Sequence, residues 1–127
     1  RYVKGLLREQ AITQYTVGQM EALLRSGRAY LMEAVGEMWH EITSTNAVTL
    51  ERRAVLRLAT THPIRLGAQI AESLYSLCGA TAAFEGNLIQ RHFQDIHVIT
   101  QHMQSRLSHY ELIGQYWLGL PIDENRL

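Results

Sequence analysis

The sequence has few of the residues that interrupt helices or cross-link small folds. Its 127 residues include two prolines, nine glycines and a single cysteine, Cys78. One cysteine cannot form a disulfide within the chain, and a lone thiol is kept reduced most easily in the cytoplasm. We therefore predict a cytoplasmic protein whose one bundle domain is long enough to fold around a hydrophobic core.

An excess of charge of either sign is also absent, because twelve basic side chains balance twelve acidic ones. A protein that binds nucleic acid or an anionic membrane surface normally carries a positive field. No apolar run approaches the roughly 20 residues that a membrane-spanning helix needs. We therefore expect neither nucleic acid nor membrane as a partner.

Helix-forming residues are what the sequence does contain. Ala, Leu, Glu, Gln and Arg are abundant, and no useful stretch shows the alternation of apolar and polar residues that marks strands. The sequence thus predicts an all-α fold, an up-and-down bundle of four helices, over residues 15–127. Residues 1–14 show no firm period, and Arg1 begins neither a signal peptide nor a chain with an initiator methionine. We expect them to be a lead-in arm from a preceding domain of a longer protein.

Apolar residues at helical spacing predict where the four helices lie. The expected ranges are about 16–42, 50–77, 88–104 and from Ser105, as a capping residue, to shortly before Pro121. Gly27 and Ala34, on the buried side of the first helix, should let a neighbouring helix approach closely. Thr49 is a plausible N-cap of the second helix, which Pro63 should kink. His62 lies on the apolar stripe of that helix and is expected to be a buried, hydrogen-bonded residue.

Residues 74 to 118 form the most informative segment. Arg91, Asp95 and His102 are separated by four and seven residues, which at 3.6 residues per turn would place them on one side of a helix. Five residues would fall on the other side and face the core: Ile89, Phe93, Ile96, Thr100 and Met103. One face could therefore bind a ligand. The plainer alternative is that Arg91 and Asp95 form an ordinary surface ion pair.

Six histidines in a helical bundle raise the alternative of a metal site. Glu37 and His40 make one copy of the Glu-x-x-His pattern that di-iron four-helix proteins use twice. The best second copy, Gln94 to His97, has an amide where the carboxylate ligand should be. We therefore expect no metal.

The order of these features over residues 16–120 resembles the C-terminal helical domain of the acyl-CoA dehydrogenase superfamily, and most closely its flavin-dependent, two-component monooxygenase branch. The family's long helix with a small-residue turn at its end is similar to TLERRAVLRLATTHPIRLGAQIAESLYSLCGATAAF. Its next helix is similar to NLIQRHFQDIHVITQH, with Leu-x-Gln-Arg and Thr-x-His patterns, and its closing helix is similar to SHYELIGQYWLGLP.

The resemblance implies a flavoprotein oxidoreductase in which FMN or FAD lies between this bundle and a preceding β domain. A neighbouring subunit would complete the site, so a homo-oligomer, a dimer or tetramer, is expected. The turn against the flavin phosphates would consist of Gly79, Ala80, Thr81 and Ala82. His102 would lie near the flavin ring as the catalytic residue, and Arg91 and Asp95 would fix the helix or loop beside it.

The residue type at position 102 favours a monooxygenase. Many acyl-CoA dehydrogenases carry a catalytic Glu at the place where this chain reads Gln101, His102, Met103 and Gln104. Two-component monooxygenases instead receive reduced flavin from a partner reductase and use O2 on an aromatic or heteroatom-bearing small molecule. His102 could hydrogen-bond the oxygen species or deprotonate a phenolic substrate. An acyl-CoA dehydrogenase is the first alternative and a non-catalytic self-association module the second, and the 127 residues alone are expected to be inactive.

Overall fold

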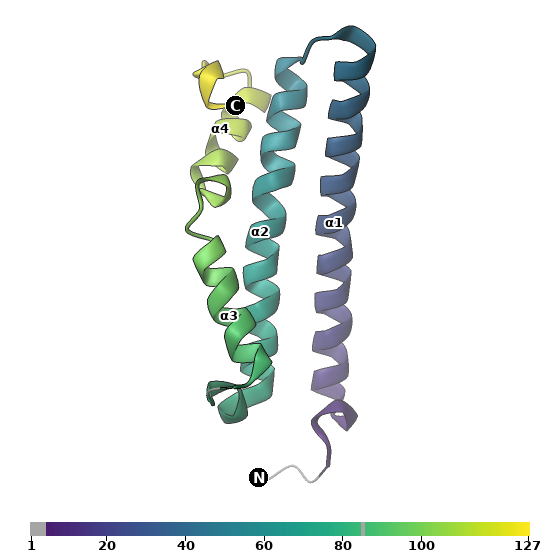
Figure 1. Cartoon of the computed structure of the whole chain (residues 1–127), viewed down its shortest axis with the longest axis vertical. Helices are drawn as coiled ribbons and strands as arrows, with labels where there is room; N and C mark the ends of the chain where they lie inside the picture. The colour runs from purple at the N-terminus through teal and green to yellow at the C-terminus, as the bar shows by residue number, and fades with distance from the viewer. Residues whose placement is uncertain (1–4, 85) are drawn as a thin grey trace.

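The structure, a computed structural model, describes residues 5–84 and 86–127 (Figure 1). These residues contain four α-helices and no strand, which confirms the predicted all-α fold. The helices are α1 (Ala11–Thr45), α2 (Leu50–Cys78), α3 (Leu88–Ile99) and α4 (Ser108–Trp117). Four short 3-10 helices accompany them: η1 (Leu7–Glu9), η2 (Gly79–Ala83), η3 (Met103–Ser105) and η4 (Glu124–Arg126).

The four helices form three columns (Figure 1). α1 and α2 are long antiparallel neighbours, while α3 and α4 follow one another end to end along the other flank of α2. α2 is therefore the central column of the bundle.

α1 begins at Ala11 rather than near residue 16, so the last residues of the predicted lead-in arm are helical. Residues 1–4 of that arm lie outside the described residues. The helix ends at Thr45, where Asn46 takes a left-handed conformation with φ of 54°. Asparagine tolerates this conformation better than most residues, because its short polar side chain can hydrogen-bond locally. The turn into α2 can therefore be tight.

Glu41 ties the end of α1 to the start of α2. Its carboxylate accepts hydrogen bonds from the Thr49 backbone N–H at 2.6 Å and from Arg52 Nε at 3.1 Å. The hydrogen bond from the Thr49 backbone is the largest cause of the lowered pKa of Glu41. The Thr49 hydroxyl in turn accepts from the Arg52 N–H at 3.3 Å, which confirms the predicted N-cap.

Small residues let α1 and α2 approach closely, as the sequence predicts. Ala34 is 2% exposed, and Gly27 is buried against α2. A Cβ added at Gly27 would lie 2.9 Å from Leu66 Cδ1 and 3.8 Å from Pro63 Cα. α2 continues unbroken through Pro63. The close packing of α1 against α2 at this point therefore depends on residue 27 having no side chain.

Only part of the apolar surface is buried by these contacts. A small core of Ala54, Leu112, Ile113 and Leu127 joins α2, α4 and the last residues of the chain. α1, by contrast, keeps large apolar side chains in solvent, among them Met32 at 61% exposed and Trp39 at 70%. A large part of the apolar surface of α1 is thus left without a partner within the described residues.

Candidate functional site

The third helix is shorter than the sequence predicts. α3 ends at Ile99 instead of continuing to about residue 104, and His102 lies beyond its end. Arg91, Asp95 and His102 therefore do not share one face of a helix, and that expectation was wrong. Ser105 does not cap the fourth helix either, because it lies in η3 and α4 starts at Ser108.

Side chains from α2 explain why the helix stops. The Thr61 hydroxyl lies 2.7 Å from the Gln104 carbonyl oxygen, and Arg65 donates from Nε to the Ser105 carbonyl at 2.8 Å and again from its terminal nitrogen. These bonds satisfy carbonyl groups that would otherwise need helical or solvent partners. We call residues 100–107 the break, and these bonds hold it against α2.

Ser105 stabilises the break from within. Its side chain is fully buried, and its hydroxyl lies within hydrogen-bond distance of the Thr100 carbonyl and 2.7 Å from that of His102. The Thr100 hydroxyl donates to the His97 carbonyl at 2.6 Å, which competes with the helical pattern at the end of α3. The backbone around His102 is therefore held by buried hydrogen bonds.

Two consecutive residues of α2 bind two consecutive residues of α4. Thr61 Oγ1 lies 2.8 Å from His109 Nδ1, and His62 Nδ1 lies 2.9 Å from the Tyr110 hydroxyl. The hydrogen-bonded state predicted for His62 is thus confirmed, although its side chain is half-buried. Burial lowers the pKa of His109, with a further contribution from the Arg57 charge, and burial also raises the pKa of Tyr110.

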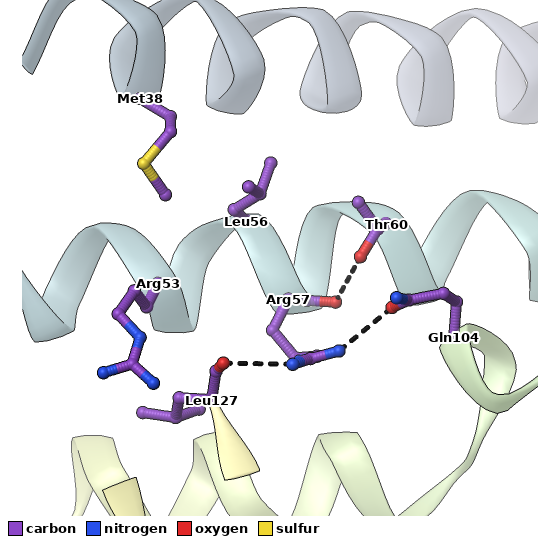
Figure 2. Close-up of a pocket in the computed structure, with 7 residues that line it drawn as sticks. All are labelled: Met38, Arg53, Leu56, Arg57, Thr60, Gln104 and Leu127. Carbon is purple, nitrogen blue, oxygen red and sulfur yellow. Dashed lines mark hydrogen bonds between the residues drawn. The ribbon is translucent and has the colours of Figure 1, made fainter. Parts of the chain in front are cut away.

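A pocket of about 220 Å³ lies where the last residues return to α2 (Figure 2). Arg57 reaches across it, donating to Gln104 Oε1 at 3.0 Å and to the Leu127 carbonyl at 3.0 Å. Arg53 donates to the Glu124 carbonyl at 2.8 Å. These arginines therefore fasten the break and the last residues onto α2.

These anchoring residues were missed by the sequence reasoning, although a signal was present. Arg53, Arg57, Thr61 and Arg65 recur at every fourth position of α2 and form a polar stripe along a helix whose other positions are largely apolar. Such a stripe on a central helix predicts polar groups on the element opposite. Here those groups are the carbonyls of the break and of the last residues.

His102 presents an exposed ring on this anchored backbone. Its Nδ1 accepts the Gln104 backbone N–H at 3.3 Å. Because one ring nitrogen of a neutral imidazole accepts and the other donates, this bond assigns the proton to Nε2. His102 can therefore donate a hydrogen bond from Nε2 to a ligand.

The predicted phosphate-side turn lies at the opposite end of α3. Gly79 has φ of +60°, and a Cβ added there would meet nothing within 4 Å. Gly79, Ala80 and Thr81 are exposed, whereas Ala82 is fully buried. Asn87 donates to the Thr81 carbonyl at 2.9 Å and fixes the turn. Small side chains and open space leave room for an anion to approach the backbone here.

Arg91 and Asp95 behave mainly as a surface pair. Arg91 Nε and Asp95 Oδ2 are 3.9 Å apart, with side chains 78% and 62% exposed. Arg91 also lines a pocket of about 310 Å³ with Gly86 and Asn87, next to the turn. The 12 residues of α3 put roughly 18 Å between this end and the break, at 1.5 Å per residue. The site residues thus form two groups, one at each end of α3.

Within residues 5–84 and 86–127, no group of three or more His, Cys, Asp and Glu side chains could hold a metal ion. Glu37, half of the Glu-x-x-His pattern, pairs with Arg52 instead. The same part of the chain contains no helix that is both long and apolar enough to cross a membrane.

Comparison with known proteins places these features in a family. Residues 2–106 match the family described as "Acyl-CoA dehydrogenase, C-terminal domain". The chain is 30% identical over 113 residues to an indole-3-acetate monooxygenase of Pseudomonas putida, which covers 89% of this chain and 29% of that protein. It is 31% identical over 91 residues to the indole-3-acetate monooxygenase of Acinetobacter baumannii, a match that covers 72% of this chain and 23% of that protein. A pigment production hydroxylase of Rhodococcus erythropolis is 26% identical over 96 residues, a match that covers 76% of this chain and 24% of that protein. The chain therefore spans less than a third of each relative.

Proposed function

Because this chain belongs to the acyl-CoA dehydrogenase C-terminal domain family, we propose that it is the flavin-proximal, oligomerising domain of a longer flavin-dependent monooxygenase. The observation that carries the proposal is its similarity to two proteins named monooxygenases and one named a hydroxylase. The absence of a carboxylate from residues 101–104 agrees with it, since an acyl-CoA dehydrogenase would need a base there. The dehydrogenase is therefore the weaker candidate.

In this proposal the whole protein takes reduced flavin, FMN or FAD, from a partner reductase. The flavin and O2 supply the oxidising chemistry. The substrate is a small aromatic or heteroatom-bearing molecule, and an aromatic acid is the class to test first, given the names of two relatives. We place the protein in the cytoplasm, where the lone thiol of Cys78 stays reduced.

His102 is proposed to act as a hydrogen-bond donor. Its Nδ1 accepts from the Gln104 N–H, so the neutral ring offers an N–H at Nε2. Acting as a base through Nε2 would require the other tautomer, which would lose this bond. Donation to the bound oxygen species or to the substrate therefore fits the geometry better than proton removal.

The two ends of α3 are proposed to meet the flavin differently. The backbone of Gly79, Ala80 and Thr81 would approach the phosphate, with Arg91 adding positive charge and Asp95 orienting it. His102 would face the ring from the other end of the helix. Because these groups are about 18 Å apart along α3, they would contact separated parts of one flavin or the flavins of two subunits.

Self-association is proposed to use the exposed part of α1. Met32, Val35, Trp39 and Ile42 are 40% to 70% exposed and follow one another at spacings of three, four and three. This spacing forms the stripe with which helices pack against each other. A dimer or tetramer would bury it.

Replacing His102 in the whole protein, supplied with reduced flavin and O2, tests this function. His102→Ala should uncouple flavin oxidation from hydroxylation, lowering product formed per flavin oxidised by about 100-fold. His102→Gln, which keeps an N–H donor, should recover part of the coupling. His40→Ala, an exposed histidine of α1, is the matched control. Unchanged coupling in His102→Ala would refute the role.

A further inference from the structure

The backbone of Gln104 contacts the ring of His102. The Gln104 N–H donates to His102 Nδ1 across 3.3 Å. This separation is longer than that of most N–H hydrogen bonds in proteins, so a small displacement of the Gln104 backbone would break the bond. The tautomer of His102 therefore depends on how firmly residue 104 is held.

Two side chains of α2 hold residue 104 in place. Arg57 donates to Gln104 Oε1 at 3.0 Å, and the Thr61 hydroxyl lies 2.7 Å from the Gln104 carbonyl oxygen. Both bonds are partly buried, where water competes less with a hydrogen bond. They hold Gln104 through its side chain and through its carbonyl, on two sides of its Cα. Its N–H is therefore kept in one direction, toward the imidazole.

Arg57 is itself fixed at a second point. One terminal nitrogen of its guanidinium donates to Gln104 and the other donates to the Leu127 carbonyl at 3.0 Å (Figure 2). The donors of a guanidinium group have a fixed, planar arrangement. A guanidinium bonded on both sides cannot follow a moving partner, so Arg57 restricts the movement of the Gln104 side chain.

We propose that Gln104, held by Arg57, is a positioning residue for His102: it keeps the imidazole in the tautomer that carries its proton at Nε2 and leaves this N–H available to a ligand. The inference rests on the proposed function, in which His102 acts as the hydrogen-bond donor. Gln104 acts through His102, because its own N–H and Oε1 are already bonded within the chain.

A purely local role of the bond is the alternative. His102 is the N-cap of η3, and its ring accepts the Gln104 N–H as a capping side chain does. If His102 only caps η3, the bond depends on the backbone of residues 102–104 and not on the side chain of Gln104. If Gln104 positions His102, replacing that side chain should release the ring.

Nitrogen NMR of the full-length protein measures the tautomer. Histidines labelled with heavy nitrogen distinguish protonated from unprotonated ring nitrogens, and subtracting the spectrum of His102→Gln isolates residue 102. At about pH 8.5, where histidine side chains are generally neutral, the wild-type proton should lie predominantly at Nε2. Gln104→Met has a similar length but no amide, and it should raise the ratio of Nδ1–H to Nε2–H about two- to tenfold, as expected for the loss of one hydrogen bond.

Three further variants separate positioning from a general disturbance of the break. Gln104→Glu keeps an oxygen for Arg57 and should restore the wild-type tautomer. Arg57→Met removes the partner instead and should release the ring as Gln104→Met does. Gln101→Met is the matched control, because Gln101 adjoins His102 on the other side and its amide donates to Thr100 Oγ1. An unchanged tautomer in folded Gln104→Met, or an equal change in Gln101→Met, would overturn the proposal.

Coupling distinguishes this inference from the proposed function. In the whole protein, Gln104→Met should lower product formed per flavin oxidised about two- to tenfold, with the KM for substrate unchanged. His102→Gln retains part of the coupling and has no tautomer to control, so adding Gln104→Met to it should cause no further loss. A further loss would overturn the positioning role. If His102→Ala leaves coupling unchanged, the proposed function of His102 fails, and the NMR measurement still decides whether Gln104 sets the tautomer.

Discussion

Thr61 shows how one buried hydroxyl fixes a change of direction in the chain. It is fully buried, and its oxygen lies near the carbonyls of Arg57 and Gln104 and near His109 Nδ1. A hydroxyl has one proton, so it donates to one carbonyl at a time and can accept from the His109 N–H. One side chain thus links α2, the break and α4.

Replacing Thr61 with valine should therefore destabilise the fold. Thr61→Val keeps the shape but leaves the partly buried Gln104 carbonyl and His109 Nδ1 without the Thr61 hydroxyl, which costs about 1–3 kcal/mol. The neighbouring Thr60 donates only to the Arg57 carbonyl of its own helix, at 3.0 Å, so Thr60→Val should change stability by less than about 0.5 kcal/mol. Urea denaturation measures both, and equal losses would contradict the argument.

His109 should make stability depend on pH. Its pKa in the folded protein lies below the ordinary 6.5, chiefly through burial and then through Arg57. As pH falls through about 6.5 the unfolded chain takes up this proton first, so the free energy of unfolding should decrease until the pH is below the lowered pKa. The side chain is only partly buried, so the effect should be a few tenths of a kcal/mol.

Urea denaturation between about pH 8 and pH 5 measures this dependence. His109→Asn removes the titrating ring and should flatten the slope in the window below 6.5. If wild type and variant have the same slope, His109 is not a source of the dependence.

At the scale of whole helices, α1 and α2 could be predicted from sequence but the end of α3 could not. Gly27, Ala34 and Thr49 carry local signals of packing and capping, and the structure confirms them. The apolar pattern of the third helix, however, continues through Thr100 and Met103, past the observed end at Ile99.

The bonds that end α3 come from far along the chain. Thr61 and Arg65 bind carbonyls 43 and 40 residues later. Helical periodicity reports only on near neighbours, so it cannot reveal such partners. The same limit affected the candidate site, because placing His102 beside Arg91 and Asp95 depended on one continuous helix. The candidate residues were identified from the resemblance to the family, whereas their separation in space results from tertiary hydrogen bonds.

The α1–α2 seam gives a test at the scale of helix packing. A Cβ at Gly27 would lie 2.9 Å from Leu66 Cδ1, so the side chain of Leu66, which is only 8% exposed, would have to shift. Gly27→Ala should therefore destabilise the protein by about 1–3 kcal/mol despite its better helix propensity. Gly36→Ala in the same helix meets nothing within 4 Å and should gain up to about 1 kcal/mol.

Thermal or urea unfolding of the two glycine variants measures the difference. The distinctive result is that the two variants should change the free energy of unfolding in opposite directions. Two stabilised variants would mean that Leu66 moves aside without cost and that α1 and α2 are not held apart by contact at residue 27.

At the scale of the whole molecule, the three columns leave many large apolar side chains exposed to solvent. The apolar cavity between α1, α2 and α3 and the stripe of Met32, Val35, Trp39 and Ile42 are separate parts of this surface. The stripe is the part of this surface that is proposed above to bind another copy of the bundle.

Trp39 is the largest member of the stripe and should anchor contact between copies. Trp39→Gln in the full-length protein should shift the mass measured by light scattering toward the monomer. Leu118→Gln is the control, because Leu118 is 78% exposed but lies just after α4 and outside the stripe. An unchanged mass for Trp39→Gln, or an equal shift in both variants, would contradict the proposed interface.

The break combines a fixed backbone with an exposed side chain at residue 102. The Ser105 hydroxyl binds the His102 carbonyl, Thr61 binds the Gln104 carbonyl, and Arg65 binds the Ser105 carbonyl. The imidazole of His102 is exposed to solvent. Residue 102 can therefore be replaced with little effect on folding. For the proposed monooxygenase, a saturation library aimed at substrate scope should begin there and should leave the α2 anchors untouched.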